Sequence, residues 1–160
     1  MNRPKTIKIL IVIYLYTFLR GFGRLFLFSS NPDYYVYSEM GLSFLFFLLS
    51  IPGLILGGLS LWYLWKPKPL GYWLILSDLV VGLINSVIGL VITLTQPDVV
   101  RNALIVYRKA RGLPVRQEVI DSVTSPAGVI GAFVVTLSIA VILAGLIYWK
   151  RDYFLQAGDV

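Results

Sequence analysis

The feature that most constrains this chain is a set of four long apolar segments joined by polar ones. They run from Thr6 to Phe28, Ser43 to Trp65, Leu70 to Leu94 and Pro126 to Trp149. Each has at least the roughly 20 residues that a helix needs to cross the ~30 Å hydrocarbon core of a bilayer. The sequence therefore predicts an all-α integral membrane protein, a four-transmembrane-helix bundle that forms a single membrane domain over residues 1–160.

The composition agrees with this prediction. Hydrophobic residues make up 58% of the chain and charged residues 14%, whereas soluble domains have about 25% charged residues. The net charge of +6 does not indicate nucleic-acid binding, because the basic residues lie at the ends of apolar segments, as membrane anchoring requires. The chain contains no cysteine and no histidine. This excludes disulfides, thiol redox chemistry and almost any zinc site, and we expect no metal and no cofactor.

The connections between the spans differ in kind. Ser29–Leu42 is predicted to be a short polar link, and Lys66–Pro69 a tight turn that makes spans two and three an antiparallel hairpin. Residues 95–125 form the only substantial region outside the spans, and we expect two short helices there, Asp98–Arg111 and Pro114–Val123. An amphipathic segment of this kind would lie on the membrane surface or over the bundle.

The helix expected over Asp98–Arg111 has an apolar side and a basic side. Val99, Ala103, Tyr107 and Ala110 are predicted to be buried, while Arg101 and Arg108 stay hydrated.

The distribution of positive charge predicts the orientation. In a four-span arrangement seven basic residues fall on the side of the two termini: Arg3, Lys5, Lys8, Lys66, Lys68, Lys150 and Arg151. Five fall on the other side: Arg101, Arg108, Lys109, Arg111 and Arg116. The positive-inside rule therefore favours both termini in the cytoplasm.

Four polar residues inside the predicted spans are the candidate site. Arg20 and Arg24 lie one helical turn apart in span one, and Asp78 and Asn85 share a stripe of span three. Arg20 and Asp78 would lie about 16 Å and 12 Å from the same interface, so the sequence predicts that they face one another as an ion pair, with Asn85 near Arg24. Three interpretations stay open: structural pairing that specifies helix packing, a site for an anionic ligand or lipid headgroup, or an Arg24 that simply extends to the interface.

Small residues give a second candidate feature. Span two contains Gly53 and Gly57 at the spacing that lets two helix backbones approach closely. We expect these glycines to pack against a neighbouring helix of the bundle, or against another copy of the chain.

No catalytic motif accompanies these features. Gly21 and Gly23 lack the third glycine of a dinucleotide fingerprint, and no phosphate-binding loop or nucleophile elbow is present. The sequence therefore favours a non-enzymatic accessory or interaction protein of a membrane assembly, with membrane lipids, a membrane-protein partner or a second copy as partners. The alternatives are a small transporter, channel or lipid- or anion-binding protein that uses the Arg/Asp/Asn cluster, and an enzyme that acts on a lipid.

Overall fold

The computed structural model describes residues 4–155, and no β-strand occurs among them. Four long helices dominate the structure: α1 (Lys5–Phe26), α3 (Ser43–Trp65), α4 (Pro69–Thr95) and α7 (Pro126–Trp149). Each is long and apolar enough to span a membrane. The all-helical fold and the four long apolar segments are therefore confirmed, with α1 ending two residues earlier than predicted.

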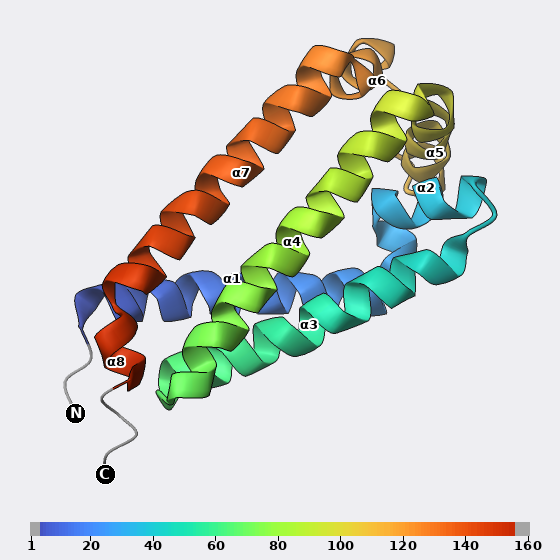
Figure 1. Cartoon of the computed structure of the whole chain (residues 1–160). Coiled ribbons are helices and arrows are strands. Elements are labelled where there is room, and N and C mark those ends of the chain that lie inside the picture. The colour runs from blue at the N-terminus through green and yellow to red at the C-terminus, as the bar shows by residue number, and fades with distance from the viewer. Residues whose placement is uncertain (1–3, 156–160) are drawn as a thin grey trace.

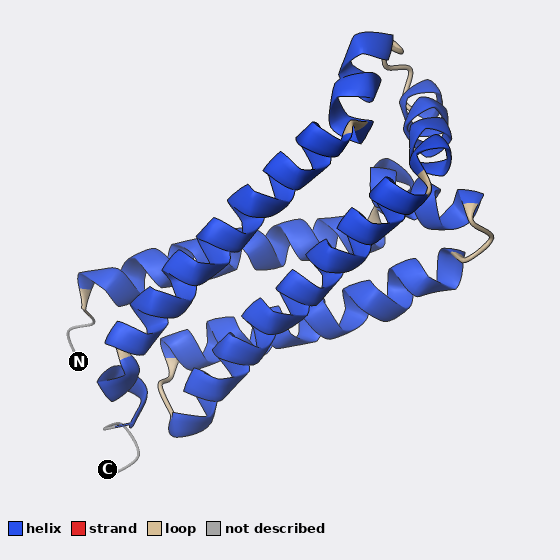
Figure 2. Cartoon of the chain, turned by 45° about the horizontal axis from the view of Figure 1, so that its top comes forward, coloured by secondary structure: helices blue, strands red, loops and turns tan. Residues whose placement is uncertain are grey.

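The long helices pack in chain order. α1 packs against α3, α3 against α4, and α4 against α7. Both views show α1 and α7 near one another close to the two chain ends, and diverging away from them (Figures 1 and 2). We call the end where α1 begins and α7 finishes the terminal end, and the opposite end the far end. The turn between α3 and α4 also lies at the terminal end, as the predicted hairpin requires.

Short helices complete the structure at both ends. The 3-10 helix η1 (Phe28–Ser30) and α2 (Pro32–Glu39) connect α1 to α3, where the sequence analysis expected only a polar link. α5 (Pro97–Ala110) and α6 (Gln117–Thr124) connect α4 to α7, as the two expected short helices. α2 packs against α5 at the far end, and α8 (Arg151–Leu155) packs against α4 at the terminal end.

A hydrophobic core joins all four long helices at the terminal end. Its buried residues come from α1, α3, α4, α7 and α8: Ile7, Leu10, Tyr14, Leu64, Ile75, Ile147 and Phe154. The hydroxyl group of Tyr153 in α8 also donates a hydrogen bond of 3.1 Å to the carbonyl of Leu64 in α3. This core fixes the terminal end of the long helices.

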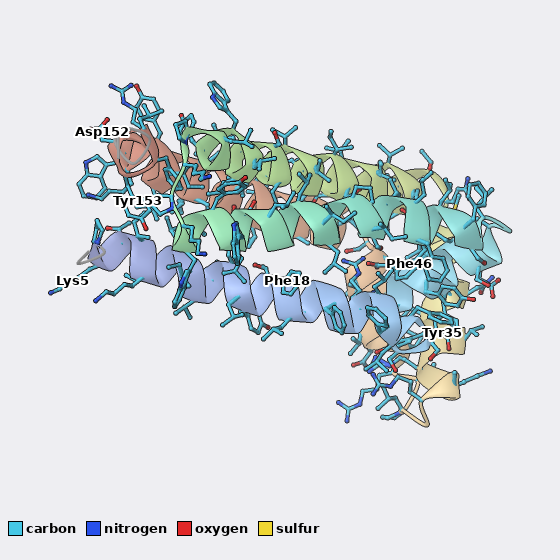
Figure 3. All side chains as sticks on the ribbon, turned by 90° about the horizontal axis from the view of Figure 1, so that it is seen from below. Lys5, Phe18, Tyr35, Phe46, Asp152 and Tyr153 are labelled. Carbon is cyan, nitrogen blue, oxygen red and sulfur yellow. The ribbon has the colours of Figure 1, made fainter. Side chains whose placement is uncertain are left out.

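The far end is held by aromatic and charged contacts instead. The rings of Tyr34 and Phe46 join α2 to α3, and those of Tyr35 and Tyr107 join α2 to α5. Tyr35 and Phe46 lie together at this end, away from Lys5 and Asp152 at the other (Figure 3). Arg101 of α5 forms an ion pair of 2.6 Å with Asp121 of α6.

The expected burial pattern of α5 is only partly correct. Ala103 is buried and Val99 and Tyr107 are partly buried, whereas Ala110 is exposed; Val100 is buried as well. The buried side of α5 therefore agrees with the prediction up to Tyr107 and does not include Ala110.

Close helix contacts occur at glycines other than the predicted pair. A Cβ atom added to Gly53 or Gly57 would meet nothing within 4 Å, so the prediction that they pack against another helix of the chain is wrong. At Gly71 in the first turn of α4, a Cβ atom would lie 2.5 Å from Cβ of Tyr63 in α3. At Gly58 it would lie 3.1 Å from the ring of Phe18 in α1. These two glycines, not Gly53 and Gly57, allow close approach.

Candidate functional site

A cavity of about 780 Å³ lies among the long helices, between the terminal core and the far-end helices. It is partly open to the surface, and residues from α1 to α7 line it. Along α4 the lining residues run from Asp78 to Thr93, a distance of about 22 Å at the helical rise. The stripe predicted for this helix faces the cavity. It contains Asp78 and Asn85, with Gly82 between them and Gly89 one turn after Asn85.

Asp78 occupies the end of the cavity nearest the terminal core. Its neighbours along the lining, Leu79 and Leu143, pack against that core. The structure gives Asp78 no hydrogen bond and no ion pair with any described residue. Tyr14, also in the lining, is only 4% exposed, and its hydroxyl oxygen is buried without a hydrogen-bond partner. The carboxyl group of Asp78 is close enough to act electrostatically on that hydroxyl.

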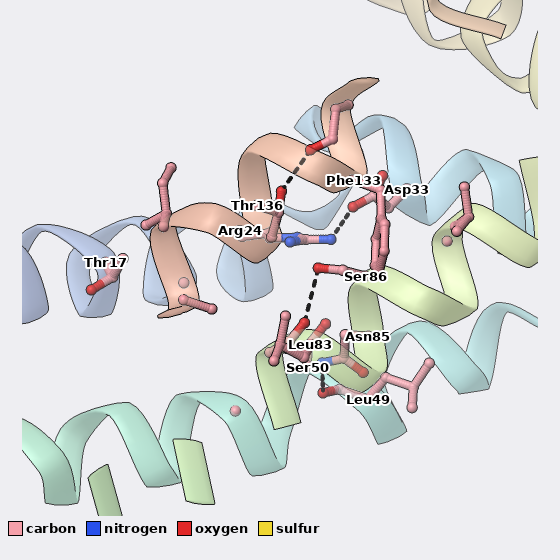
Figure 4. A pocket seen from close by; sticks show the side chains of 18 of the residues that line it. Thr17, Arg24, Asp33, Leu49, Ser50, Leu83, Asn85, Ser86, Phe133 and Thr136 are labelled. Atoms are coloured by element: carbon pink, nitrogen blue, oxygen red, sulfur yellow. Dashed lines mark hydrogen bonds and ion pairs between the residues drawn. The ribbon is translucent and has the colours of Figure 1, made fainter. Parts of the chain in front are cut away.

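An ion pair marks the far end of the cavity. Arg24, in the last turn of α1, is hydrogen-bonded to the carboxylate of Asp33 in the first turn of α2, and Figure 4 shows Arg24 directed toward it. Both side chains are about half exposed, at 47% and 49%. Tyr37 lies beside the pair, and burial raises the pKa of its hydroxyl, with a further increase from Asp33 that Arg24 opposes.

Most polar groups in the middle of the cavity donate a hydrogen bond within the described part of the protein, but the Ser50 hydroxyl and one of the two amide hydrogens of Asn85 do not. Asn85 donates from Nδ2 to the carbonyl of Leu49 in α3, at 3.4 Å, which links α4 to α3 (Figure 4). Four lining hydroxyl groups donate to the carbonyl four residues earlier in their own helix, at 2.7 to 3.0 Å: Thr17, Ser86, Thr93 and Thr136. Their oxygens remain free to accept, so the middle of the cavity offers mainly acceptors.

The predicted pairing of Arg20 with Asp78 is not found. Arg20 is exposed, is not among the residues that line the cavity, and forms no ion pair with Asp78. The stripe of α1 that faces the cavity passes through Tyr14, Thr17 and Gly21, so Arg20 lies at its edge. α1 packs mainly against α3, which in turn packs against α4. Of the two arginines, Arg24 reaches the cavity, and its partner is Asp33.

Sequence reasoning missed Asp33, Tyr14 and Tyr37. The signal for α2, which carries Asp33 and Tyr37, is local: the side chain of Asn31 accepts a hydrogen bond of 3.1 Å from the backbone of Asp33, and Pro32 occupies the first helical position. Asparagine before proline and aspartate is typical of a helix start. No comparable signal exists for Tyr14, since a tyrosine within an apolar span is compatible with either face.

Comparison with known proteins identifies no relative: no family model, no curated protein and no solved structure matches the chain.

Proposed function

We propose that the protein is an integral membrane protein whose four long helices cross the bilayer. With 22 to 27 residues each, they measure about 33–40 Å at the helical rise, enough for a hydrocarbon core of ~30 Å. Their outer faces are apolar: Val12, Leu48 and Val141 are each 60% exposed or more. Apolar surface costs about 25 cal/mol per Å² in water, and lipid removes this cost.

The proposed orientation has both termini in the cytoplasm, on the basis of the seven-to-five distribution of basic residues. Six of these seven residues are described and lie at the terminal end, while Arg3 lies outside the described residues. Reporter fusions in the turn Lys66–Pro69 should give a cytoplasmic signal, and an external signal there would overturn this orientation.

We further propose that the protein binds an amphipathic organic molecule inside this membrane domain. The cavity carries this proposal, since about 780 Å³ falls within the ~300–1,000 Å³ range of small-molecule sites. Its lining is mainly apolar, with a few polar groups at defined places, which is the usual composition of such a site. Charged and polar residues at membrane depth are costly, and in proteins they line ligand or ion pathways.

The cavity favours this function over the accessory role expected from the sequence. That expectation depended partly on Gly53 and Gly57 as a packing surface, but both glycines line the cavity and contact no other helix. The anion-binding alternative loses support as well, because Arg24 is paired with Asp33 and Arg20 lies outside the cavity. An accessory role through the outer helix faces stays a prediction.

Co-purification from native membranes tests the proposed binding. The wild-type protein would be isolated in polymer-bounded native lipid particles, and its small molecules identified by mass spectrometry. Gly53→Leu places a side chain in the cavity, and Gly145→Leu is the matched control because Gly145 is exposed, lies outside the lining and has open space around its Cβ position.

We expect one molecular class to be enriched with the wild-type and Gly145→Leu proteins and lost from Gly53→Leu. Equal contents in all three preparations would overturn the proposal.

A further inference from the structure

The charges of the cavity do not balance. Among the described residues that line it, Arg24 is the only basic one, and Asp33 and Asp78 are the two acidic ones. Arg24 and Asp33 form an ion pair at the far end. Asp78 is left as the uncompensated charge, about 22 Å along α4 from Thr93 at the other limit of the lining.

The hydrogen-bonding groups point to the same kind of ligand. The lining hydroxyl groups of α1, α4 and α7 have donated their hydrogens to helix carbonyls, and Asn85 has donated to Leu49. The hydroxyl groups of Tyr14, Tyr37 and Ser50 form no hydrogen bond with any described residue, and Asn85 keeps one amide hydrogen free, so these few donors stand against the carboxylate of Asp78 and the oxygens of the other lining groups. Acceptors therefore outnumber free donors, and a ligand that donates hydrogen bonds would fit.

The surroundings of Asp78 leave space for such a ligand. A carboxylate in an apolar region is costly unless it is paired and hydrogen-bonded, and no described residue supplies a partner. The buried hydroxyl of Tyr14, which has no hydrogen-bond partner among the described residues, belongs to the lining of the same cavity. Two polar groups of one cavity that the described residues leave unsatisfied indicate that the missing partner comes from outside the chain.

We propose that the cavity binds an organic cation, a primary or secondary amine on an apolar body, with its ammonium group at Asp78. This inference rests on the proposed ligand-binding function and specifies the class of ligand. The ammonium group would donate a hydrogen bond to the Asp78 carboxylate. Hydrogen bonds between charged partners are stronger than those between neutral ones. Its apolar body would extend along α4 toward the far end, past the glycine-lined wall of α3.

Direct binding of two probes of equal chain length tests the proposal. Radiolabelled decylamine and radiolabelled 1-decanol would be titrated onto the protein in phosphatidylcholine nanodiscs at pH 7, with empty nanodiscs subtracted to remove simple partitioning. We expect Asp78→Asn to raise the Kd for decylamine at least tenfold, which corresponds to about 1.4 kcal/mol, and to change the Kd for 1-decanol less than twofold.

Two further variants serve as controls for this measurement. Asp98→Asn removes one negative charge at an exposed position of α5 outside the lining and should leave both Kd values unchanged. Asp78→Glu keeps the carboxylate and should keep most of the preference for the amine. Retained binding of 1-decanol by Asp78→Asn shows that this variant is folded.

The possible results separate the two proposals. The assignment of an organic cation is wrong if the wild-type protein binds both probes equally, or if Asp78→Asn binds decylamine as well as the wild type does. In either case, loss of binding of both probes in Gly53→Leu would still support the cavity as a binding site. If Gly53→Leu binds both probes like the wild type, the proposed function itself fails. Failure of the wild type to bind decylamine overturns the cation assignment.

The source of the amine is tested by changing the lipid. If the natural occupant is an amine-bearing lipid, nanodiscs that contain phosphatidylethanolamine should weaken decylamine binding to the wild-type protein by competition. Phosphatidylcholine, whose quaternary nitrogen donates no hydrogen bond, should not compete. Unchanged decylamine binding in both lipids would assign the site to a free amine.

Discussion

The contact between Gly71 and Tyr63 offers the sharpest test of how α3 and α4 pack. A Cβ atom at Gly71 would lie 2.5 Å from Cβ and 3.0 Å from Cγ of Tyr63, whereas carbon atoms pack best at about 3.5–4.0 Å. Tyr63 meets the new methyl group with the base of its side chain, which cannot rotate away. In Gly71→Ala the two helices must therefore separate by about 1 Å at this point.

The magnitude follows from two opposing effects. Overpacking a tight contact costs about 1–3 kcal/mol, while replacing a helical glycine by alanine contributes about 0.5–1 kcal/mol through backbone entropy. Gly57→Ala is the matched control, because a Cβ atom there would meet nothing within 4 Å. The Gly57→Ala control should be stabilised by the backbone-entropy effect alone. The free energies of unfolding of the two variants should therefore differ by the overpacking cost of about 1–3 kcal/mol.

Thermal unfolding in detergent, followed by tryptophan fluorescence, measures this difference. Since 1 kcal/mol shifts Tm by about 2–4 °C in a domain of this size, Gly71→Ala should unfold several degrees below Gly57→Ala. If Gly71→Ala unfolds at the same temperature or higher, α3 and α4 do not approach closely at the turn, and the sequence-based choice of Gly53 and Gly57 as packing residues gains support.

Three further predictions concern α2 and the charged residues of the long helices α1 and α4. Asn31→Ala removes the N-cap of α2 at a cost of about 1 kcal/mol, and amide exchange in this helix should become several-fold faster by mass spectrometry. Burial raises the pKa of the Tyr37 hydroxyl above its usual value of 10.0, so the neutral hydroxyl stabilises the folded state below pH 10. This stabilisation is lost as the pH rises through the raised pKa. In denaturant titrations above pH 10, Tyr37→Phe should therefore lose less stability than the wild type. Because Arg20 and Asp78 form no ion pair, Arg20→Gln and Asp78→Asn should change stability additively within about 0.3–0.5 kcal/mol in a double-mutant cycle. Coupling above 1 kcal/mol would contradict their separation.

Hydropathy and spacing predicted the elements well, because both are local properties. The segment from Leu70 to Leu94 was predicted within one residue of α4, and its polar stripe with Asp78 and Asn85 does face the interior. Which helices are neighbours depends instead on how each face packs. The sequence analysis placed Arg20 opposite Asp78, yet the face of α1 that lines the cavity with Asp78 carries Tyr14 and Thr17. Arg20 lies outside this face, is exposed and forms no ion pair with any described acid.

The polar segment between α1 and α3 shows a different limit. Read for hydropathy alone, residues 29–42 form a link, but the Asn31 cap and Pro32 start a helix that brings Asp33 to Arg24. The capping signal is visible in the sequence. The sequence does not show that the chain reverses after α1, and this reversal brings Asp33 to Arg24. A pair nine residues apart was overlooked in favour of one 58 residues apart.

The glycines explain why a cavity exists where a tight contact was predicted. Small residues bring helices together only if nothing else holds them apart. Here the terminal core fixes one end of the long helices, and at the other end α2 packs against α3 and α5 packs against α4. Gly53 and Gly57 on α3, with Gly82 and Gly89 on α4, therefore line open space. The glycines that were expected to close the bundle thus widen a cavity in which, among the described lining residues, Asp78 is the acid without an ion-pair partner.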